Sequence, residues 1–307
     1  FMLAIAILAS RPTTAAVEYL QRALVIGCTA TAAGSLARGV YVEAGRLSGV
    51  GTLDPNDLAA VASIGALAAL GIIMRRTTRP LARLLSLVAV GVLVLVIVKT
   101  GSRGGVLAVA TGSLVLVALQ PGARRLGLAA LVVIAAASAW SFGPESFRER
   151  IGSMVAGQKD YNATEYYGRD ALRERALQYT FERPIFGVGW QMFGEYEGRS
   201  CMAQGRRGCK WMAPHNMYVQ VSSELGLPGL LLFLGLLVAA LRAAWQTARP
   251  SLARLRPAAF RPELFATLVS YCVSGYFLSH AYLYVAVALM ALSELAAAAV
   301  RRGAVVA

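Results

Sequence analysis

Several short segments of the chain combine residue types that suit phosphate binding or proton transfer. Residues 100–105 read Thr-Gly-Ser-Arg-Gly-Gly and stand between two apolar runs. Thr or Ser at such a place starts a helix, and the first backbone N–H groups of a helix bind phosphate well. Arg103, with Ser102 beside it, adds a planar charge that matches two phosphate oxygens. The alternative is a glycine-rich hairpin with one Arg at the membrane surface.

A second segment, Pro-His-Asn-Met-Tyr, could transfer a proton. His215 is one of only two His in the chain, and an imidazole can accept a proton near neutral pH. Asn216 and Tyr218 could orient the imidazole or a sugar hydroxyl. Glu224 follows within an apolar run, where a carboxylate needs a partner. The alternative is an interfacial His next to a Tyr of the aromatic belt.

Two further segments carry arginines. Arg46, in Gly-Arg-Leu-Ser-Gly, precedes Asp-Pro-Asn-Asp, in which Asp54 or Asn56 can cap a helix. Arg46 could reach a phosphate, although this segment alone looks like a plain loop before a capped helix. Arg169, in Gly-Arg-Asp, begins a helical pattern that Pro184 ends. The alternative there is a solvated helix whose acidic residues pair with its basic ones.

These segments belong to a chain whose composition is that of a membrane protein. Of its 307 residues 57% are hydrophobic and 15% are charged, whereas soluble domains carry about 25% charged residues. Apolar runs of about 18 residues indicate spanning helices, and the alternation typical of a barrel does not appear. We therefore expect an all-α integral membrane protein, a polytopic helical bundle of about eight spans. The predicted spans are 16–39, 58–74, 84–98, 104–120, 126–140, 218–245, 264–278 and 282–300.

The domain organisation follows from these runs. We expect residues 1–307 to form a single transmembrane domain, with one large loop at 141–214 that contains helices and is inserted between spans. The apolar stretch 1–9 is too short to span a bilayer and lacks the basic start of a signal peptide. We interpret it as the end of an earlier span, and therefore expect further spans upstream.

The distribution of arginines predicts the orientation. The net charge is +14, and most arginines fall in loops that alternating spans place on one face, the cytoplasmic one. The net positive charge therefore reports which face of the membrane protein is cytoplasmic, and we expect no nucleic-acid partner. The opposite face nevertheless carries Arg38, Arg46 and Arg103 in short segments, where the rule disfavours them. We expect these three side chains to have a binding role.

Two cysteines lie in the large loop, on the face predicted to be oxidising. Cys201 and Cys209 could form a disulfide there. A metal site is the weaker alternative, because no second Cys pair or His cluster accompanies them in the sequence.

Taken in their order along the chain, the segments resemble the O-antigen ligase and polymerase superfamily of bacterial envelope enzymes. The resemblance rests on Gly-Arg-x-x-Gly with Asp-Pro-Asn, on Thr-Gly-Ser-Arg-Gly, on Gly-Arg with a helix ending Arg-Pro-x-x-Gly-x-Gly, and on Pro-His-Asn-x-Tyr with Glu-x-Gly-x-x-Gly. It extends from Arg38 to Gly229. One large loop between the Ser-Arg-Gly and Pro-His-Asn elements is similar to the lipopolysaccharide O-antigen ligases, whereas polymerases often divide their periplasmic loops differently.

The resemblance implies a metal-independent glycosyltransferase without cofactors, in the bacterial inner membrane and with its active site on the periplasmic face. The donor would be O-antigen polysaccharide on undecaprenyl pyrophosphate, the acceptor a sugar hydroxyl of lipid A–core, and both would arrive from the membrane lipid. His215 would be the general base, and Arg103 and Arg169 would stabilise the pyrophosphate leaving group. The predicted substrate-binding residues are Arg38, Arg46, Asn56, Ser102, Asn216 and Tyr218.

Other functions are compatible with the same segments. An O-antigen or exopolysaccharide polymerase would use the same chemistry on a different acceptor. A protein O-oligosaccharyltransferase belongs to the same superfamily. A lipid-linked sugar transporter is the alternative without catalysis, and it predicts paired broken helices or an internal repeat, neither of which the sequence shows.

Overall fold

The computed structural model of the chain describes residues 12–42, 45–51, 53–75, 77–156 and 166–305. The stretch 1–9, interpreted above as the end of an earlier span, lies outside the described residues. The chain divides into two compact units. Unit 1 comprises Phe1–Val155, Ala239–Ser274 and Leu283–Ala307, and unit 2 comprises Ala156–Val238 and Gly275–Tyr282.

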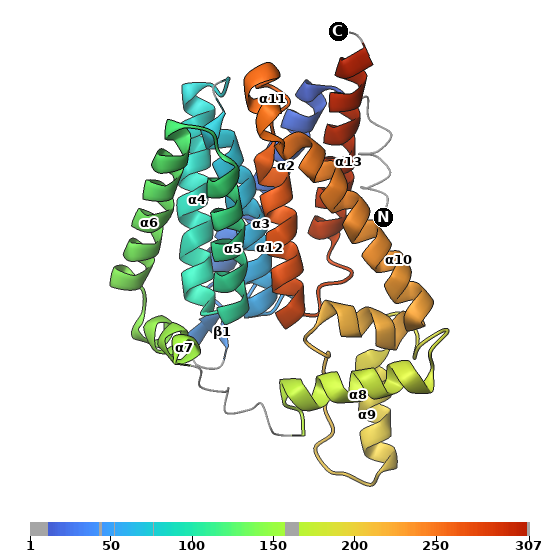
Figure 1. Cartoon of the computed structure of the whole chain (residues 1–307). Helices are drawn as coiled ribbons and strands as arrows, with labels where there is room; N and C mark the ends of the chain where they lie inside the picture. Colours follow the sequence, from blue (N-terminus) through green and yellow to red (C-terminus); the bar gives the residue numbers. More distant parts are fainter. Residues whose placement is uncertain (1–11, 43–44, 52, 76, 157–165, 306–307) are drawn as a thin grey trace. The chain divides into compact units, whose positions relative to one another are not determined.

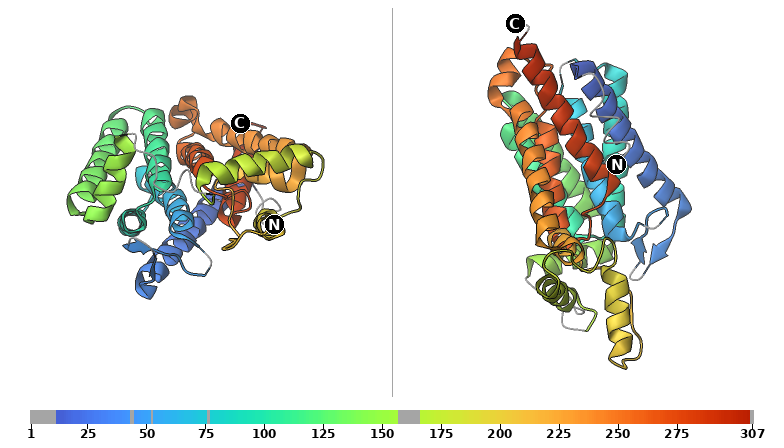
Figure 2. Two further views of the ribbon diagram at one scale, coloured as in Figure 1. Left: turned by 90° about the horizontal axis from the view of Figure 1, so that it is seen from below. Right: turned by 90° about the vertical axis from the view of Figure 1, so that its right-hand side faces the viewer.

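Unit 1 is a bundle of helices with one small hairpin, which appears as two short blue arrows in Figure 2. The hairpin pairs β1 (Tyr41–Val42) with β2 (Arg46–Leu47) in antiparallel register. The helices of the described part are α2 (Thr14–Arg38), α3 (Pro55–Met74), α4 (Pro80–Thr100), α5 (Arg103–Leu119), α6 (Ala123–Phe142), α7 (Glu145–Val155), α11 (Pro250–Leu255), most of α12 (Pro262–Phe277), and α13 (Tyr284–Val305).

The core of unit 1 is helix α3, around which α2, α4 and α5 pack (Figure 1). Its start is determined locally, because the Asp54 carboxylate accepts from the backbone N–H groups of Asn56 and Asp57, and Pro55 stands at the first helical position. Small residues let its neighbours approach: a Cβ on Gly105 of α5 would lie 2.5 Å from the Cβ of Ala59. The helix is therefore almost completely buried.

A tight hairpin joins α4 to α5. Helix α4 ends at Gly101, whose left-handed backbone (φ 56°) suits a residue without a Cβ. The next residue, Ser102, caps α5, and its Oγ accepts from the N–H of Gly105 at 3.2 Å. The Thr-Gly-Ser-Arg segment is thus a helix end followed directly by a helix start.

A buried ion pair lies at the other end of α3. Arg75 donates to the carboxylate of Glu263 at the start of α12 and to the side-chain oxygen of Gln21 in α2. Burial and the nearby Arg75 charge lower the pKa of Arg261 to about 10. A Cβ on Gly71 would lie 2.2 Å from the Cγ of Glu263, so the close approach of α12 to α3 requires glycine here.

Unit 2 is built from α8 (Arg169–Glu182), α9 (Phe193–Ala203) and the first part of α10 (Met217–Ala248). Leu172, Ala176 and Tyr179 on one face of α8 bury against Phe193 of α9. Within this core the fully buried Glu197 carboxylate is paired with Arg175 at 2.7 Å and accepts from the Tyr179 hydroxyl at 2.9 Å. The large loop therefore contains helices with a core of their own.

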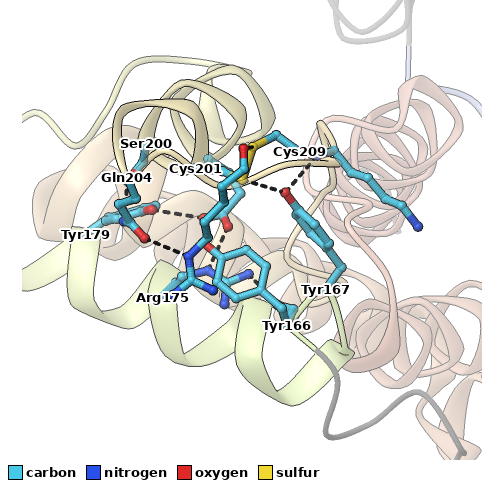
Figure 3. Close-up of a disulfide and its surroundings, with 11 residues drawn as sticks. Tyr166, Tyr167, Arg175, Tyr179, Ser200, Cys201, Gln204 and Cys209 are labelled. Atoms are coloured by element: carbon cyan, nitrogen blue, oxygen red, sulfur yellow. Dashed lines mark hydrogen bonds and ion pairs between the residues drawn. A yellow bond between two sulfur atoms is a disulfide. The ribbon is translucent and has the colours of Figure 1, made fainter.

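A disulfide joins Cys201 at the end of α9 to Cys209 (Figure 3). The Tyr167 hydroxyl lies 3.1 Å from the Cys201 sulfur and accepts from the Lys210 N–H at 2.7 Å. The ring of Tyr166 lies under the guanidinium groups of both Arg175 and Arg206, at 4.2 and 4.4 Å. These contacts hold the segment after α9 against the start of α8.

The all-α class predicted from the sequence is confirmed. The eight predicted spans correspond to α2, α3, α4, α5, α6, α10, α12 and α13. Five described helices are long and apolar enough to cross a membrane by length and composition: α3, α4, α6, α10 and α13. Helices α5 and α12, with 17 and 16 residues, are too short for that standard, and α2 is not among the helices that reach it.

One predicted span, 218–245, is not a single continuous helix. Helix α10 breaks at Gly226, whose backbone (φ 71°, ψ −175°) is accessible only to glycine, and Figure 1 shows the resulting change of direction. Pro228 follows, and it has no N–H to donate to the carbonyl of Glu224. The break explains why an apolar run of 28 residues in the sequence is longer than one span requires.

Candidate functional site

The predicted site residues fall into two groups, one in each unit. In unit 1, the guanidinium of Arg46 donates to the carbonyl of Thr100 at 2.8 Å and to the side-chain oxygen of Asn56 at 2.7 Å. The Ser102 hydroxyl donates to the same Asn56 oxygen at 3.0 Å. Asn56 is buried at the start of α3, and it joins the β2 hairpin, α3 and the α4–α5 turn. The structure thus brings together three residues that the sequence predicted as substrate contacts.

Arg103 lies on the other side of the same turn. Its Nε donates to the carbonyl of Arg150 at 3.1 Å, and its Nη2 donates to the Ser153 hydroxyl at 2.8 Å. Arg150 in turn donates to the carbonyl of Gly101 at 3.1 Å. Two half-buried guanidinium groups from α5 and α7 are therefore held together at the start of α5. This arrangement concentrates positive charge where a helix N-terminus is already electropositive.

Arg38 takes no part in this network of described residues. It is the last residue of α2 and it is exposed, and Gly39 follows in the left-handed conformation that ends the helix. A long Arg side chain at such a position can move over the surface at little cost, so its role as a substrate contact stays a prediction.

In unit 2, His215 stands in a constrained turn before α10. Its backbone is left-handed (φ 51°), a conformation that few residues other than glycine adopt. The turn is held from two sides, because the N–H of His215 donates to the Ser279 hydroxyl at 2.9 Å and its carbonyl accepts from Arg173 at 3.3 Å. Backbone strain of this kind persists where the surroundings impose it, and it clusters at functional sites.

Helix α8 connects this turn with Arg169. Arg173 also donates to the carbonyl of Tyr276 at 3.0 Å and lies over its ring at 5.2 Å. Arg169 is four residues earlier in α8 and shares the same face. The structure therefore places Arg169, a predicted catalytic residue, one helical turn from the side chain that holds the His215 backbone.

The two residues predicted beside His215 have structural contacts. The side-chain oxygen of Asn216 accepts from the N–H groups of Tyr218 and Val219 at 2.9 and 3.1 Å, so it caps α10. This oxygen is already used, and only the amide N–H₂ of Asn216 is left for a substrate. Tyr218 lies half-buried in the first turn of α10. Both stay predicted substrate contacts.

Glu224 has the partner that its apolar surroundings require. Its carboxylate accepts from the backbone N–H groups of Gln191 and Phe193 at 3.2 and 3.4 Å. Gln191 is left-handed (φ 56°), which turns these two N–H groups toward the carboxylate. Burial, together with the Glu224 charge, raises the pKa of Tyr282 nearby. The Arg-Pro-Ile-Phe-Gly-Val-Gly motif therefore leads into a loop that encloses Glu224 and the α10 break.

Residues 92–234 match the family described as O-antigen ligase. The chain carries an O-antigen ligase domain. This match confirms the resemblance to the O-antigen ligase and polymerase superfamily that the motifs indicated. No curated protein matches the chain.

The O-antigen ligase domain, as matched, contains Arg103, Arg169 and His215. Arg38, Arg46 and Asn56 precede it in the sequence, yet Asn56 and Arg46 bond directly to its α4–α5 turn. Among the residues that the structure describes, no three His, Cys, Asp or Glu side chains gather into a group that could hold a metal ion.

The structure adds residues to these groups that the sequence motifs did not identify. Arg150 and Ser153 lie in a charged stretch with no motif that would set them apart. Arg173 could be recognised as sharing a face with Arg169, but its bond to the His215 carbonyl joins residues 42 positions apart. Ser279 lies still further away, in a short turn. Only the fold brings each of them to the group of predicted site residues in its own unit.

Proposed function

We propose that this protein joins O-antigen polysaccharide, carried on undecaprenyl pyrophosphate, to a sugar hydroxyl of lipid A–core. The reaction takes place on the periplasmic face of the bacterial inner membrane and needs neither metal nor cofactor. The observation that carries the proposal is the O-antigen ligase match, because residues 92–234 contain every predicted catalytic side chain. The two groups of residues described above support the roles that follow.

His215 acts as the general base. Its imidazole takes the proton from the acceptor hydroxyl as the hydroxyl oxygen forms a bond to the anomeric carbon of the donor sugar. The bond from that carbon to the pyrophosphate oxygen breaks, and its electron pair leaves with the undecaprenyl pyrophosphate. The turn that holds the His215 backbone through Arg173 and Ser279 supports this role, because it limits the positions of the ring.

The arginines stabilise the charge that develops on the leaving pyrophosphate. Arg103 and Arg169 are the principal contacts, and Arg46 and Arg38 are secondary ones. Fixed cations at the developing charge lower the barrier most when they need no rearrangement. The bonds of Arg103 to Arg150 and Ser153, and of Arg46 to Asn56, support this because they hold the guanidinium groups before substrate arrives. That the groups of the two units meet on one substrate is part of the proposal.

The test is transfer by the purified protein in vesicles, with lipid-linked glycan as donor and lipid A–core as acceptor. His215→Asn is the sharper variant, since Asn tolerates the left-handed backbone at this position and lacks a basic ring nitrogen. We expect it to lower the transfer rate by about 10²–10⁴, and Arg103→Ala by about 10²–10³. Arg199→Ala, at an exposed pair on α9, is the control and should transfer normally.

Two further observations decide between the alternatives. With donor alone, a ligase leaves the glycan unchanged, whereas a polymerase lengthens it, and lengthening would replace the proposed reaction by polymerisation. Transfer that persists in a chelator is expected. Full activity of His215→Asn would refute the assignment of the base, and strict dependence on a metal would refute the mechanism.

A further inference from the structure

Unit 2 exposes a group of large apolar side chains at the end of α8 and in the loop that follows. We call them the apolar lip: Leu177, Phe181, Ile185, Phe186, Trp190 and Met192. Phe186 is 84% exposed and Phe181 is 75% exposed. Single exposed apolar residues are ordinary, but a contiguous group on one segment marks a surface that contacts something other than water.

The exposed side of α8 changes character along the helix. Asp170 and Glu174 are exposed in its first turns, whereas Leu177 and Phe181 are exposed in its last ones. The opposite side of the helix carries Leu172, Ala176 and Tyr179, which belong to the core of unit 2. The last turns of α8 thus expose two large apolar side chains next to Gln178 and Glu182, which bond to each other there.

The backbone of the loop that carries the lip is hydrogen-bonded to α10 at its break. The carbonyl of Pro184 accepts from the N–H of Leu227 at 2.7 Å, and the N–H groups of Val188 and Gly189 donate to the carbonyls of Ser223 and Glu224 at 2.8 and 3.0 Å. These bonds replace the ones that the helix loses at Gly226 and Pro228. A Cβ on Gly226 would lie 2.4 Å from the carbonyl oxygen of Ile185, so the loop touches the helix directly.

The position of the break in α10 determines where the lip lies relative to the bilayer. The 22 residues after Gly226, up to Ala248, rise about 33 Å, close to the hydrocarbon thickness of a bilayer. Leu231 and Leu232, in the first turns after the break, are 69% and 76% exposed, as lipid-facing residues of a spanning helix are. Gly226 therefore lies at the membrane boundary, and the loop bonded to it lies at the same level.

We propose that the apolar lip of unit 2 is inserted into the boundary between headgroups and acyl chains of the bilayer, next to α10. The occupant of this surface is the lipid itself, because the loop that carries the lip is bonded to α10 at residues 223–227, directly before the exposed Leu231 and Leu232. Trp190 has the amphipathic ring typical of that boundary. Arg183, exposed between Phe181 and Ile185 and lying over the Tyr196 ring at 5.2 Å, adds a positive charge that anionic headgroups attract. The inference does not depend on the transfer reaction.

The test is the accessibility of Trp190 to lipid in the full chain. The chain has four Trp, and three are replaced by Phe to leave Trp190 alone. A second protein keeps only Trp211, which belongs to the same unit and is 52% exposed against 61% for Trp190. Each is reconstituted in phosphatidylcholine–phosphatidylglycerol vesicles that contain lipid brominated near the top of the acyl chain. We expect bromolipid to quench Trp190 several-fold more than Trp211, and aqueous iodide to do the reverse.

Two results would overturn the inference. Weak bromolipid quenching of Trp190 together with strong iodide quenching would show that the lip faces water, and failure of both quenchers to reach Trp190 would show that protein covers it. Phe186→Glu provides a second measurement, which should reduce bromolipid quenching of Trp190 severalfold, while Phe186→Leu preserves it. Unchanged quenching in Phe186→Glu would also contradict the proposal. Trp211 emission, measured in the corresponding variants, confirms that unit 2 remains folded.

Discussion

The buried carboxylate of Glu197 offers the sharpest test of how unit 2 holds together. Glu197 is fully buried between α8 and α9, and it is bonded to Arg175 and to the Tyr179 hydroxyl. Replacing it by Ala leaves the Arg175 cation without its counter-charge and the Tyr179 hydroxyl without its acceptor. We expect this single change to loosen the contact between the two helices, although it touches no residue proposed for catalysis.

The magnitude follows from the two lost partners. Breaking a buried ion pair from one side costs about 3–5 kcal/mol, and the lower end applies because the Arg175 side chain keeps 17% exposure and a bond to the Tyr166 carbonyl. The unsatisfied Tyr179 hydroxyl adds about 1 kcal/mol. Glu197→Ala should therefore lower the free energy of opening unit 2 by about 4 kcal/mol. Glu197→Gln, which keeps an acceptor but loses the charge, should cost about half as much.

Hydrogen exchange read by mass spectrometry measures this free energy in the intact protein, from the slowest amides of α8. A loss of about 4 kcal/mol corresponds to exchange about 10³ times faster. The matched control is Arg199→Ala, which breaks an exposed pair on the same helix and should change the opening free energy by under about 0.5 kcal/mol. If exchange in Glu197→Ala rises less than about tenfold, or no more than in the control, the pair does not stabilise unit 2 as argued.

Two other predictions concern a close approach and a proton. Gly71→Ala places a methyl group against the buried Glu263 side chain and should destabilise unit 1 by about 3 kcal/mol, which would lower the melting temperature in detergent. The control is Gly91→Ala, because a Cβ there would have nothing within 4 Å, and its melting temperature should not change. Equal effects of the two substitutions would contradict the packing of α3 against Glu263. Burial and the Glu197 charge raise the pKa of Tyr179, so the folded state holds this proton more tightly than the unfolded chain. Its contribution to stability is present below the ordinary Tyr pKa of about 10 and is lost as the pH rises beyond the folded value. The difference between the ultraviolet titrations of wild type and Tyr179→Phe isolates this phenol, and ionisation near its ordinary pKa would refute the shift.

Much of the fold could be predicted from the sequence because its signals are local. The Asp54 carboxylate caps α3 and the Ser102 hydroxyl caps α5 as the residue types indicate, and Gly101 ends α4. Length and apolar content are likewise properties of a single segment, and each predicted span has its helix. The order of the motifs was sufficient to recognise the family, since a family pattern is itself a sequence pattern.

The grouping of side chains could not be predicted in the same way. Asn56 was expected to face a substrate, and the structure also makes it the acceptor for Arg46 and Ser102. Such pairings depend on which helices pack together, and they join residues tens of positions apart. The bonds that hold His215 come from α8 and from the turn after α12 for the same reason.

The break in α10 shows what the sequence indicates and what only the tertiary structure decides. Gly226 and Pro228 in the sequence mark a weak point in the helix, but hydropathy alone treats the run as continuous. Backbone groups freed inside an apolar helix need partners, and those come from the loop at 184–189, which only the tertiary structure brings there. The sequence by itself therefore determined the helices, their caps and the family, because each is encoded within a short stretch. The tertiary structure decided where the helix breaks and which side chains meet, because both require hydrogen bonds between distant segments.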